Sequence, residues 1–244
     1  MAIRKRLDVL LVERGLIDSR ARARAAIEAG KVTVEGRIAA KPGELVDRTA
    51  AIAAEPAHPW VSRAALKLVH ALELWPVAVE GRIVLDVGAS TGGFTEVCLA
   101  RGAARVFAVD VGRGQLHPSL TADPRVVGLE ATDARALDRR LVPDPAGLIV
   151  CDASFIGLAK VLPAALVLAG PGADLIALVK PQFEVGPGRV GKGGIVKDAA
   201  AQAEALEAAK AFVEAEGWAV QQTADSPILG GDGNREFLLW ARRP

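Results

Sequence analysis

Short apolar runs and longer amphipathic stretches alternate over most of the chain, with turn residues between them. Such apolar runs are typical of buried strands, and the amphipathic stretches are typical of helices. We expect strands near 82–87, 105–110, 126–129, 147–151, 174–180, 218–222 and 236–241, and helices near 93–101, 157–169 and 198–216. A further helix is expected between Ser62, which can cap it, and Pro76, which ends it. This alternation predicts a doubly wound α/β sheet, and the last two strands, with no helix between them, predict an antiparallel pair at its edge.

A different pattern occupies residues 1–55. We expect helices over 7–14 and 20–29, a hairpin over 32–38, and short strands at 45–46 and 51–53. Two helices and a small sheet in so short a segment predict a separate α+β domain. The segment 56–60 contains prolines and is expected to be an extended linker, so that residues 61–244 form the larger domain.

The composition allows a well-packed core, because 51% of the 244 residues are hydrophobic and 24% are charged. Two cysteines and three histidines are too few for a disulfide framework or a metal cluster. No uncharged apolar run reaches the roughly 18 residues that a membrane span needs. The basic start is interrupted by Asp8 and Glu13, unlike a secretory signal. We expect a cytoplasmic protein with no metal and no membrane partner.

Positive charge is concentrated at the N-terminus although the net charge is only +1. Residues 1–31 hold eight basic and four acidic side chains. The candidate RNA-binding residues are Arg4, Arg6, Arg20, Arg22, Arg24 and Lys31. Such side chains contact phosphates and provide affinity without reading sequence. The alternative is an ordinary solvated face of a charged helix.

A glycine-rich turn follows the first strand of the larger domain. A strand that turns through glycines into a helix lets backbone N–H groups approach a ligand closely. The next strand ends in Asp110, which can accept hydrogen bonds from both hydroxyls of a ribose. The candidate cofactor-binding residues are Asp86, Gly88, Ala89, Ser90, Gly92, Gly93, Phe94, Asp110, Asp133 and Asp152. Asp86, just before the first glycine, favours the positively charged S-adenosylmethionine over NAD with its pyrophosphate.

The same turn also matches the G-x-S-x-G pattern of hydrolases around Ser90. A hydrolase of that type needs an acid and then a histidine further along the chain. Only His117 follows Ser90, and it follows too closely to complete such a site. A hydrolase is therefore disfavoured, whereas an NAD site stays open as an alternative.

Polar residues stand at the carboxyl end of each of the first five expected strands of the larger domain: Asp86, Asp110, Asp133, Asp152 and Lys180. In an open α/β sheet these ends meet at one rim, where ligands bind. Any one of them could be a loop cap. Together they predict a site.

The N-terminal pattern resembles the small RNA-binding module first named from a ribosomal small-subunit protein. The blocks that carry this resemblance are Arg6–Asp8, Leu11–Gly15, Ser19–Arg20, Gly30–Val32 and Lys41–Gly43. The resemblance implies an RNA partner and agrees with the local excess of positive charge.

The larger domain contains the blocks 62–68, 86–95, 108–116, 151–156, 179–184 and 233–237 in this order. The series resembles the TlyA family, also called hemolysin A, whose catalytic domain is like the FtsJ-type RNA methyltransferases. The likeness covers nearly the whole chain. It implies a Rossmann-like methyltransferase domain that uses S-adenosylmethionine, preceded by a small N-terminal RNA-binding domain. The implied reaction is methylation of the ribose 2′-hydroxyl of cytidines in ribosomal RNA or ribosomal subunits.

The resemblance places a catalytic Lys-Asp-Lys-Glu set on Lys67, Asp152, Lys180 and Glu236. A ribose hydroxyl is a poor nucleophile, so methyl transfer needs a group that takes or stabilises its proton. We interpret Lys180 as that group and Asp152 as the residue that positions it, while Lys67 and Glu236 hold the ribose. The alternative is that Lys67 and Glu236 form a surface ion pair.

Three other functions stay open: a non-catalytic ribosome-assembly factor, a membrane-lysing protein as the older family name suggests, and a small-molecule methyltransferase. The complete acid and lysine set disfavours the assembly factor. The absence of an apolar span disfavours the membrane-lysing protein, and the basic N-terminus disfavours the small-molecule methyltransferase. The glycine-rich run 186–194 is expected to be a mobile loop in which Lys192 contacts RNA phosphate. It lacks the spacing of a P-loop.

Overall fold

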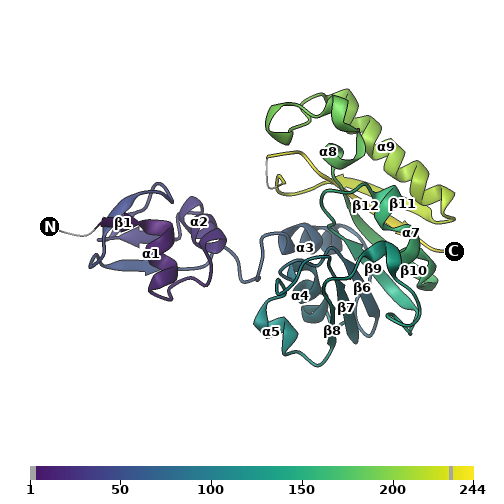
Figure 1. Cartoon of the computed structure of the whole chain (residues 1–244), viewed down its shortest axis with the longest axis horizontal. Helices are drawn as coiled ribbons and strands as arrows, with labels where there is room; N and C mark the ends of the chain where they lie inside the picture. The colour runs from purple at the N-terminus through teal and green to yellow at the C-terminus, as the bar shows by residue number, and fades with distance from the viewer. Residues whose placement is uncertain (1–3, 231–232) are drawn as a thin grey trace. The chain divides into compact units, whose positions relative to one another are not determined.

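The computed structural model describes residues 4–230 and 233–244, and the chain divides into two compact units, residues 1–59 and 60–244 (Figure 1). Each unit has a buried hydrophobic core of its own. Trp60 and Val61 pack against a core of the larger unit, which therefore begins directly after Pro59.

The smaller unit contains two helices and two small antiparallel sheets. Its helices are α1 (Leu7–Glu13) and α2 (Arg20–Glu28). One sheet pairs β1 (Arg4–Arg6) with β4 (Leu45–Asp47), and the other has the order β3 (Arg37–Ile38), β2 (Val32–Val34), β5 (Ile52–Ala54). The expected helices, hairpin and short strands are confirmed. The sequence pattern did not predict β1, because all three of its side chains are charged and only its pairing with β4 makes it a strand.

Both helices of the smaller unit end where the sequence signals place their ends. The Ser19 hydroxyl accepts a hydrogen bond from the N–H of Arg22 at 3.3 Å and caps α2. Gly15 and Gly30 follow the two helices with φ of 65° and 71°, the left-handed conformation that glycine adopts without strain. The capped helices then bury a shared apolar core that includes Leu7, Leu10, Leu11, Ala23, Ala26 and Ile27.

The larger unit is built on a seven-stranded sheet with the order β11-β12-β10-β9-β6-β7-β8. The strands are β6 (Ile83–Val87), β7 (Arg105–Val109), β8 (Val126–Leu129), β9 (Ala146–Cys151), β10 (Ala169–Val179), β11 (Ala219–Asp225) and β12 (Phe237–Arg242). The strands from β10 to β8 run parallel, while β12 runs antiparallel to both of its neighbours. The doubly wound sheet and its antiparallel edge pair are thus confirmed.

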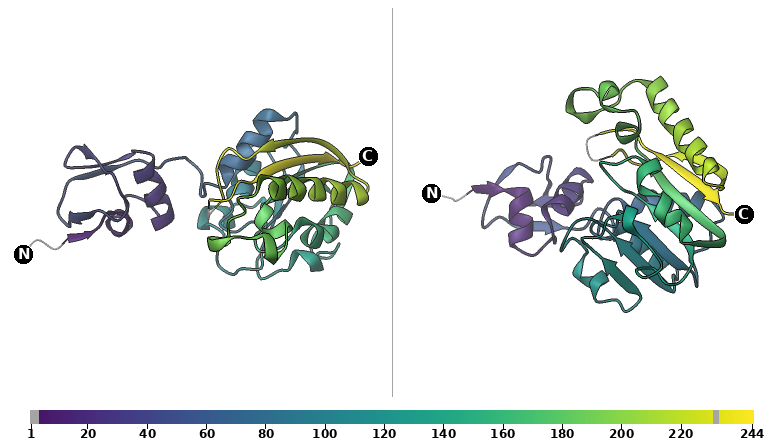
Figure 2. Two further views of the ribbon diagram at one scale, coloured as in Figure 1. Left: turned by 90° about the horizontal axis from the view of Figure 1, so that it is seen from above. Right: turned by 45° about the vertical axis from the view of Figure 1, so that its right-hand side comes forward.

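Helices cover both faces of this sheet (Figures 1 and 2). In β9 the side chains alternate, so that Leu148 and Val150 join one core cluster while Ile149 and Cys151 join the other. The first face is covered by α3 (Ala65–Leu74) and α4 (Gly93–Ala100), and the second by α6 (Leu158–Val161), α7 (Pro163–Val167) and α9 (Ala199–Ala215). The other short helices are α5 (Pro118–Thr121), η1 (Ala134–Ala136), α8 (Pro181–Glu184), η2 (Pro187–Arg189) and η3 (Lys192–Gly194).

Three local predictions for the larger unit are wrong. The single helix expected over 157–169 is two short helices, α6 and α7, because Pro163 has no N–H with which to continue the ladder. Its last residue, Ala169, already begins β10, which starts earlier than the strand expected over 174–180. Ser62 does not occupy the N-cap of α3. Its hydroxyl accepts the N–H of Ala64 at 3.0 Å in the turn before that helix.

Candidate active site

The turn from β6 to α4 brings the backbone close to its neighbours at two glycines. Gly88 has a φ of 85°, and a Cβ there would lie 2.7 Å from the Cα of Ala153. Gly92 has a φ of 94°, and a Cβ there would lie 2.2 Å from a methyl carbon of Leu120. At Gly88 only glycine satisfies both the conformation and the space, because the neighbouring atoms are backbone, and at Gly92 the left-handed conformation favours glycine. The loop that carries Ala153 can therefore pack directly against the glycine-rich turn.

Asp86 lies beneath this turn and is fully buried. One of its carboxylate oxygens accepts a hydrogen bond from the Thr95 hydroxyl at 2.6 Å, while Oδ1 has no hydrogen-bond partner in the structure. Burial raises the pKa of Asp86 to about 7. A buried carboxylate with an unpaired oxygen is stabilised by a positive charge nearby, and a cationic ligand would supply that charge.

We expect the Asp86 carboxyl to make the ligand-free protein less stable as the pH rises from about 4 to about 7. In the unfolded chain the carboxyl loses its proton near pH 4, whereas in the folded chain it keeps the proton up to about pH 7. The unfolded state therefore binds fewer protons in this window and is increasingly favoured. Asp86→Asn should remove this effect and raise the free energy of unfolding at pH 8 by up to about 4 kcal/mol.

Urea unfolding of wild type and Asp86→Asn at pH 5 and pH 8 measures this difference. Asp123→Asn is the matched control, because the Arg125 guanidinium lowers the pKa of Asp123 and its titration lies below the window. Equal pH dependence in wild type and Asp86→Asn would show that Asp86 does not titrate in this range.

A cavity of about 450 Å³ lies beyond the ends of β6 and β7, and we call it the Asp110 cavity. The two Asp110 oxygens accept the backbone N–H groups of Ser90 and Gly112, each at 2.8 Å. Asp133 lines the same cavity and pairs with Arg135 at 2.6 Å, which lowers the pKa of Asp133 to about 2. Both carboxyl groups therefore stand at one cavity as hydrogen-bond acceptors, which suits hydroxyl donors such as those of a ribose.

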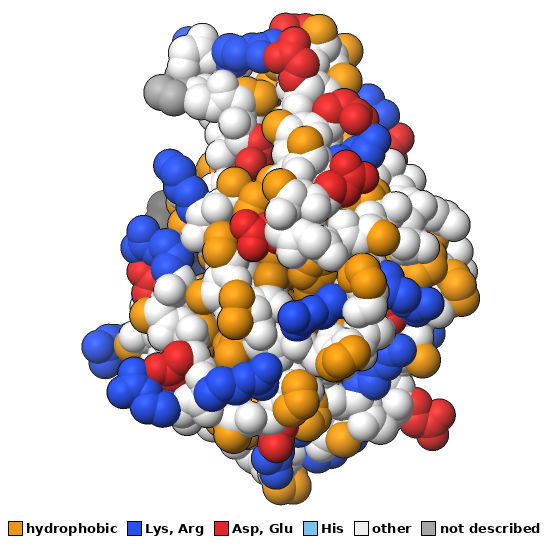
Figure 3. All heavy atoms as spheres, turned by 90° about the vertical axis from the view of Figure 1, so that its right-hand side faces the viewer, with side chains coloured by type: hydrophobic (Ala, Val, Ile, Leu, Met, Phe, Trp, Pro, Cys, Tyr) orange, Lys and Arg blue, Asp and Glu red, His pale blue; other side chains and the backbone are white. Residues whose placement is uncertain are grey.

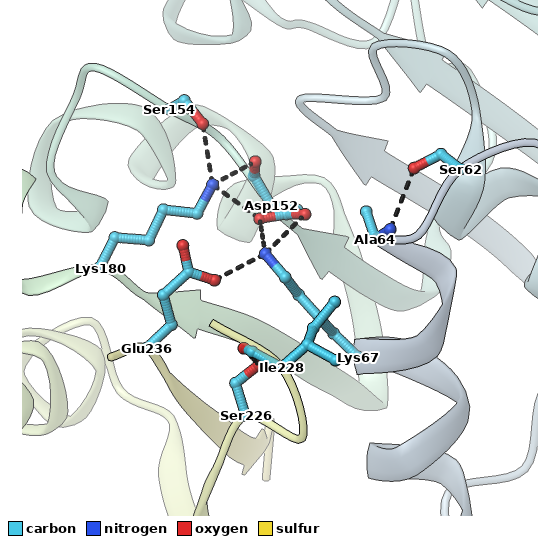
Figure 4. A network of polar contacts seen from close by, with 9 residues as sticks. All are labelled: Ser62, Ala64, Lys67, Asp152, Ser154, Lys180, Ser226, Ile228 and Glu236. Carbon is cyan, nitrogen blue, oxygen red and sulfur yellow. Dashed lines mark hydrogen bonds and ion pairs between the residues drawn. The ribbon is translucent and has the colours of Figure 1, made fainter. Parts of the chain in front are cut away.

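A second cavity, of about 390 Å³, contains the predicted catalytic set, and we call it the tetrad cavity. Lys180 Nζ lies 2.7 Å from Asp152 Oδ1, and Lys67 Nζ lies 2.6 Å from Glu236 Oε2. Lys67 Nζ also lies 3.5 Å from the Asp152 carboxylate, so that Asp152 stands between the two lysines (Figure 4). The structure thus brings all four residues into one connected network.

Three members of this network are buried: Lys67 is 6%, Lys180 5% and Glu236 3% exposed. The alternative that Lys67 and Glu236 form a surface ion pair is therefore wrong. Buried charges that form a hydrogen-bonded network carry a large desolvation penalty and often mark functional sites.

The sheet order explains why residues so distant in sequence meet here. Asp152 directly follows β9, and Lys180 directly follows β10, its parallel neighbour. Since β12 runs antiparallel to β10, its first residue, Phe237, pairs with Val179 at the end of β10. Glu236, just before β12, is thereby carried to the same rim, while α3 supplies Lys67 from the covering layer.

The structure adds two residues that the sequence analysis did not single out. The Ser154 hydroxyl accepts a hydrogen bond from Lys180 Nζ at 2.8 Å, and Ser154 lines both cavities. Phe155 also lines both cavities, has a φ of 66° and is 90% exposed, with its ring 5.3 Å from that of Phe183. Their position in the loop that begins with Asp152 is the signal that could have found them.

The candidate cofactor residues divide into four groups in space. Gly88 and Ser90 line both cavities, as does Asp152, whereas Asp110 and Asp133 line only the Asp110 cavity. On the tetrad side the turn contributes Ala89, Gly93 and Phe94. Asp86 and Gly92 line neither cavity: the first supports the turn from below, and the second shapes it.

The glycine-rich run expected to be mobile contains the short helices η2 and η3 and is held by Asn234, which is 1% exposed. The Asn234 amide donates to the carbonyl of Gly194 at 2.8 Å and accepts the N–H of Val196 at 2.9 Å. Lys192 is exposed on this segment. Asn234 thus ties the run to the strand entry that carries Glu236.

On the smaller unit, a buried acid organises two of the predicted RNA-binding arginines. Arg6 and Arg20 each form an ion pair with the fully buried Asp8, at 2.9 and 3.0 Å, and hydrogen bonding to Arg6 is the main cause that lowers the pKa of Asp8 to about 2. Arg22 instead pairs with Asp18 at 2.6 Å. Lys31 lies 3.6 Å from Glu55, and Arg4 and Arg24 are exposed. Asp8 therefore holds two half-exposed guanidinium groups on one surface.

The fold and the site together define the class of this protein, that of the Rossmann-like methyltransferases. Its structure matches that of a candidate S-adenosylmethionine-dependent methyltransferase from Listeria monocytogenes, with a TM-score of 0.57 over 75% of this chain and all of the other, at 12% identity. It also matches a hemolysin candidate from Streptococcus thermophilus, with a TM-score of 0.78 and 38% identity over all of this chain and 90% of the other.

Residues 60–243 match the model of the FtsJ-like methyltransferase family, and residues 5–52 match the S4 domain. The chain is 50% identical to the 16S/23S rRNA (cytidine-2′-O)-methyltransferase TlyA of Mycobacterium tuberculosis, over 99% of this chain and 91% of that protein. The chain belongs to the FtsJ-like methyltransferase family, and the resemblance to its TlyA members is confirmed.

Within residues 4–230 and 233–244, no helix is both long and apolar enough to cross a membrane. On the face drawn in Figure 3, hydrophobic side chains are interspersed with basic and acidic ones.

Proposed function

We propose that the protein transfers a methyl group from S-adenosylmethionine to the 2′-hydroxyl of a cytidine in ribosomal RNA. The observation that carries the proposal is the buried network of Lys67, Asp152, Lys180 and Glu236 in a cavity that adjoins a second one. Two cavities that share Asp152 suit a reaction between two bound molecules. The 50% identical TlyA protein, by its name, methylates the 2′ oxygen of cytidine in 16S and 23S rRNA.

The Asp110 cavity is suited to the cofactor. Asp110 and Asp133 would accept hydrogen bonds from the hydroxyl and amine groups of an adenosine, and the unpaired oxygen of Asp86 favours a cation nearby. When bound, S-adenosylmethionine supplies an electrophilic methyl group on a positively charged sulfur.

The tetrad cavity is suited to the target nucleoside. Lys180 would take the proton of the ribose hydroxyl, and Asp152, 2.7 Å away, would hold Lys180 in place. Lys67 and Glu236 would hold the ribose. The exposed ring of Phe155 offers a face on which a base can stack, because an aromatic ring so exposed gains little from its own packing.

The smaller unit would bring the enzyme to RNA through its arginines, four of which lie on α2 and β1 at exposed or half-exposed positions. Phosphate contacts of this kind give affinity that falls with salt. Ribosomal RNA as the substrate would place this activity in the cytoplasm.

The decisive experiment is transfer of a labelled methyl group from S-adenosylmethionine to ribosomal subunits from a strain that lacks this protein. We expect label in RNA at a cytidine whose 3′ phosphodiester resists alkaline cleavage, because that cleavage needs a free 2′-hydroxyl.

Arg4→Gln/Arg24→Gln should leave the rate of methyl transfer at saturating subunits unchanged and raise the concentration of subunits needed for half saturation. The salt dependence of binding should weaken by about one unit of log slope for each arginine.

Free S-adenosylmethionine with no RNA serves as the blank, and a small nucleoside as the alternative methyl acceptor. RNA binding without any methyl transfer would favour the assembly-factor alternative. Label on the nucleoside but not on RNA would favour a small-molecule methyltransferase.

A further inference from the structure

Three oxygen atoms surround the Lys180 ammonium. Its Nζ lies 2.7 Å from Asp152 Oδ1, 3.0 Å from the Asp152 carbonyl oxygen and 2.8 Å from Ser154 Oγ. A lysine ammonium has three N–H donors. The contacts to the Asp152 carbonyl oxygen and to Ser154 are hydrogen bonds, and the contact to Asp152 Oδ1 is an ion pair (Figure 4). All of them lead to oxygens of the loop after β9.

A base must carry a lone pair where the ammonium now has an N–H. The Asp152 carboxylate and carbonyl oxygens only accept hydrogen bonds, so neither can face a lone pair on the nitrogen. The Ser154 hydroxyl both accepts and donates. Ser154 is thus the one of the three contacts that can accept a hydrogen bond from the ammonium and donate one to the lone pair of the neutral amine.

Ser154 is also the contact that a substrate meets. Lys180 is 5% exposed and lines only the tetrad cavity, whereas Ser154 is exposed and lines both cavities. The backbone at the neighbouring Phe155 has a left-handed φ of 66°, and Gly88 allows the loop to pack against the glycine-rich turn. The hydroxyl is therefore held at the junction where the two bound molecules would meet.

We propose that Ser154 is a catalytic residue that relays the substrate proton to Lys180, an inference that rests on the proposed function. The ribose 2′ O–H bond breaks as its proton passes to Ser154 Oγ, and the Ser154 O–H bond breaks as that proton passes to the lone pair of neutral Lys180. The ribose oxygen forms the new bond to the methyl carbon, and the electron pair of the former carbon–sulfur bond stays on the sulfur. One positive charge disappears at sulfur and one appears at Lys180.

The test compares Ser154→Ala and Ser154→Thr with wild type in single-turnover methyl transfer to ribosomal subunits. We expect Ser154→Ala to slow the transfer about 10- to 100-fold, since one proton-transfer group usually contributes about 10²- to 10⁴-fold and Lys180 remains. Ser154→Thr keeps a hydroxyl and should recover most of the rate. Ser119→Ala, which removes an exposed hydroxyl bonded to His117, is the control and should match wild type.

Two further measurements separate a relay from a merely structural contact. The rate is also measured in mixtures of H2O and D2O and plotted against the deuterium fraction. The wild-type plot should be curved, because two protons move in the same step, and the plot for Ser154→Ala should be a straight line. In the cofactor-free protein, ¹⁵N NMR of the lysine side chains should show faster exchange of the Lys180 ammonium protons with water in Ser154→Ala. Dissociation constants for S-adenosylmethionine and RNA should stay within about twofold of wild type, since the relay acts after binding.

The relay would be overturned if Ser154→Ala transferred methyl at the wild-type rate and if both proteins gave a straight line in the H2O and D2O mixtures. That result would mean that the ribose hydroxyl displaces Ser154 from Lys180. Failure of the proposed function looks different: the wild-type protein itself would put no label on RNA, and the relay would be rejected with it.

Discussion

Lys180→Ala should reduce methyl transfer to ribosomal subunits by about 10²- to 10⁴-fold, the range that a lost proton-transfer group produces. Lys180 is the member of the network that contacts both Asp152 and Ser154, at 2.7 and 2.8 Å. Without it, Ser154 loses the nitrogen base to which it is hydrogen-bonded, and the 2′-hydroxyl keeps its proton. The measurement is the single-turnover rate with saturating S-adenosylmethionine and RNA, so that weaker binding does not contribute.

A matched control for this variant is Lys210→Ala, which removes an exposed lysine that pairs with Glu207 on α9. It should label RNA at the wild-type rate. Lys180→Arg keeps a positive charge but cannot lose a proton near neutral pH, so it should be as slow as Lys180→Ala. Full activity of Lys180→Arg would mean that Lys180 acts through its charge alone and takes no proton.

The sequence predicted the fold well wherever periodicity and strand ends decide the structure. The strands β6, β7, β9 and β10 each end at or next to a predicted polar residue, and Asp133 follows β8 in the loop that leads to η1. The alternation within β9 matches a sheet buried on both faces. The helix expected over 157–169 failed because the apolar pattern continues through Pro163 and Ala169, whose backbone roles depend on neighbouring strands.

The site was predictable in part. Asp110 and Asp133 followed from the strand ends, but Lys67 and Glu236 came only from the family resemblance, because their meeting depends on the antiparallel placement of β12. Ser154 and Phe155 were missed because the sequence does not show that the Ser154 hydroxyl contacts Lys180 or that the Phe155 ring is exposed. Asp86 was assigned a direct cofactor contact, while the structure places it beneath the turn, where it lines neither cavity.

Lys67→Met should destabilise the larger unit by about 3–5 kcal/mol, because it leaves a buried charge without its partner. Glu236 is 3% exposed, and the ammonium of Lys67 lies 2.6 Å from its carboxylate. Glu236→Leu should destabilise less, since Lys67 keeps the Asp152 carboxylate at 3.5 Å. Urea unfolding measures both, and breaking the exposed pair Arg105 and Asp144, 3.7 Å apart, is the control, with an expected change below about 1 kcal/mol.

The double variant Lys67→Met/Glu236→Leu separates stability from function. Replacing both members of a buried ion pair by apolar groups is often neutral or stabilising, so we expect unfolding free energy within about 1 kcal/mol of wild type. Methyl transfer should stay as low as in either single variant, because an apolar pair cannot hold a ribose hydroxyl. If the double variant recovered both stability and methyl transfer, the pair would be structural. If it recovered stability alone, the buried ion pair would be needed for catalysis in spite of its desolvation penalty. We expect this second outcome, because Lys67 lies between Glu236 and Asp152 in the network.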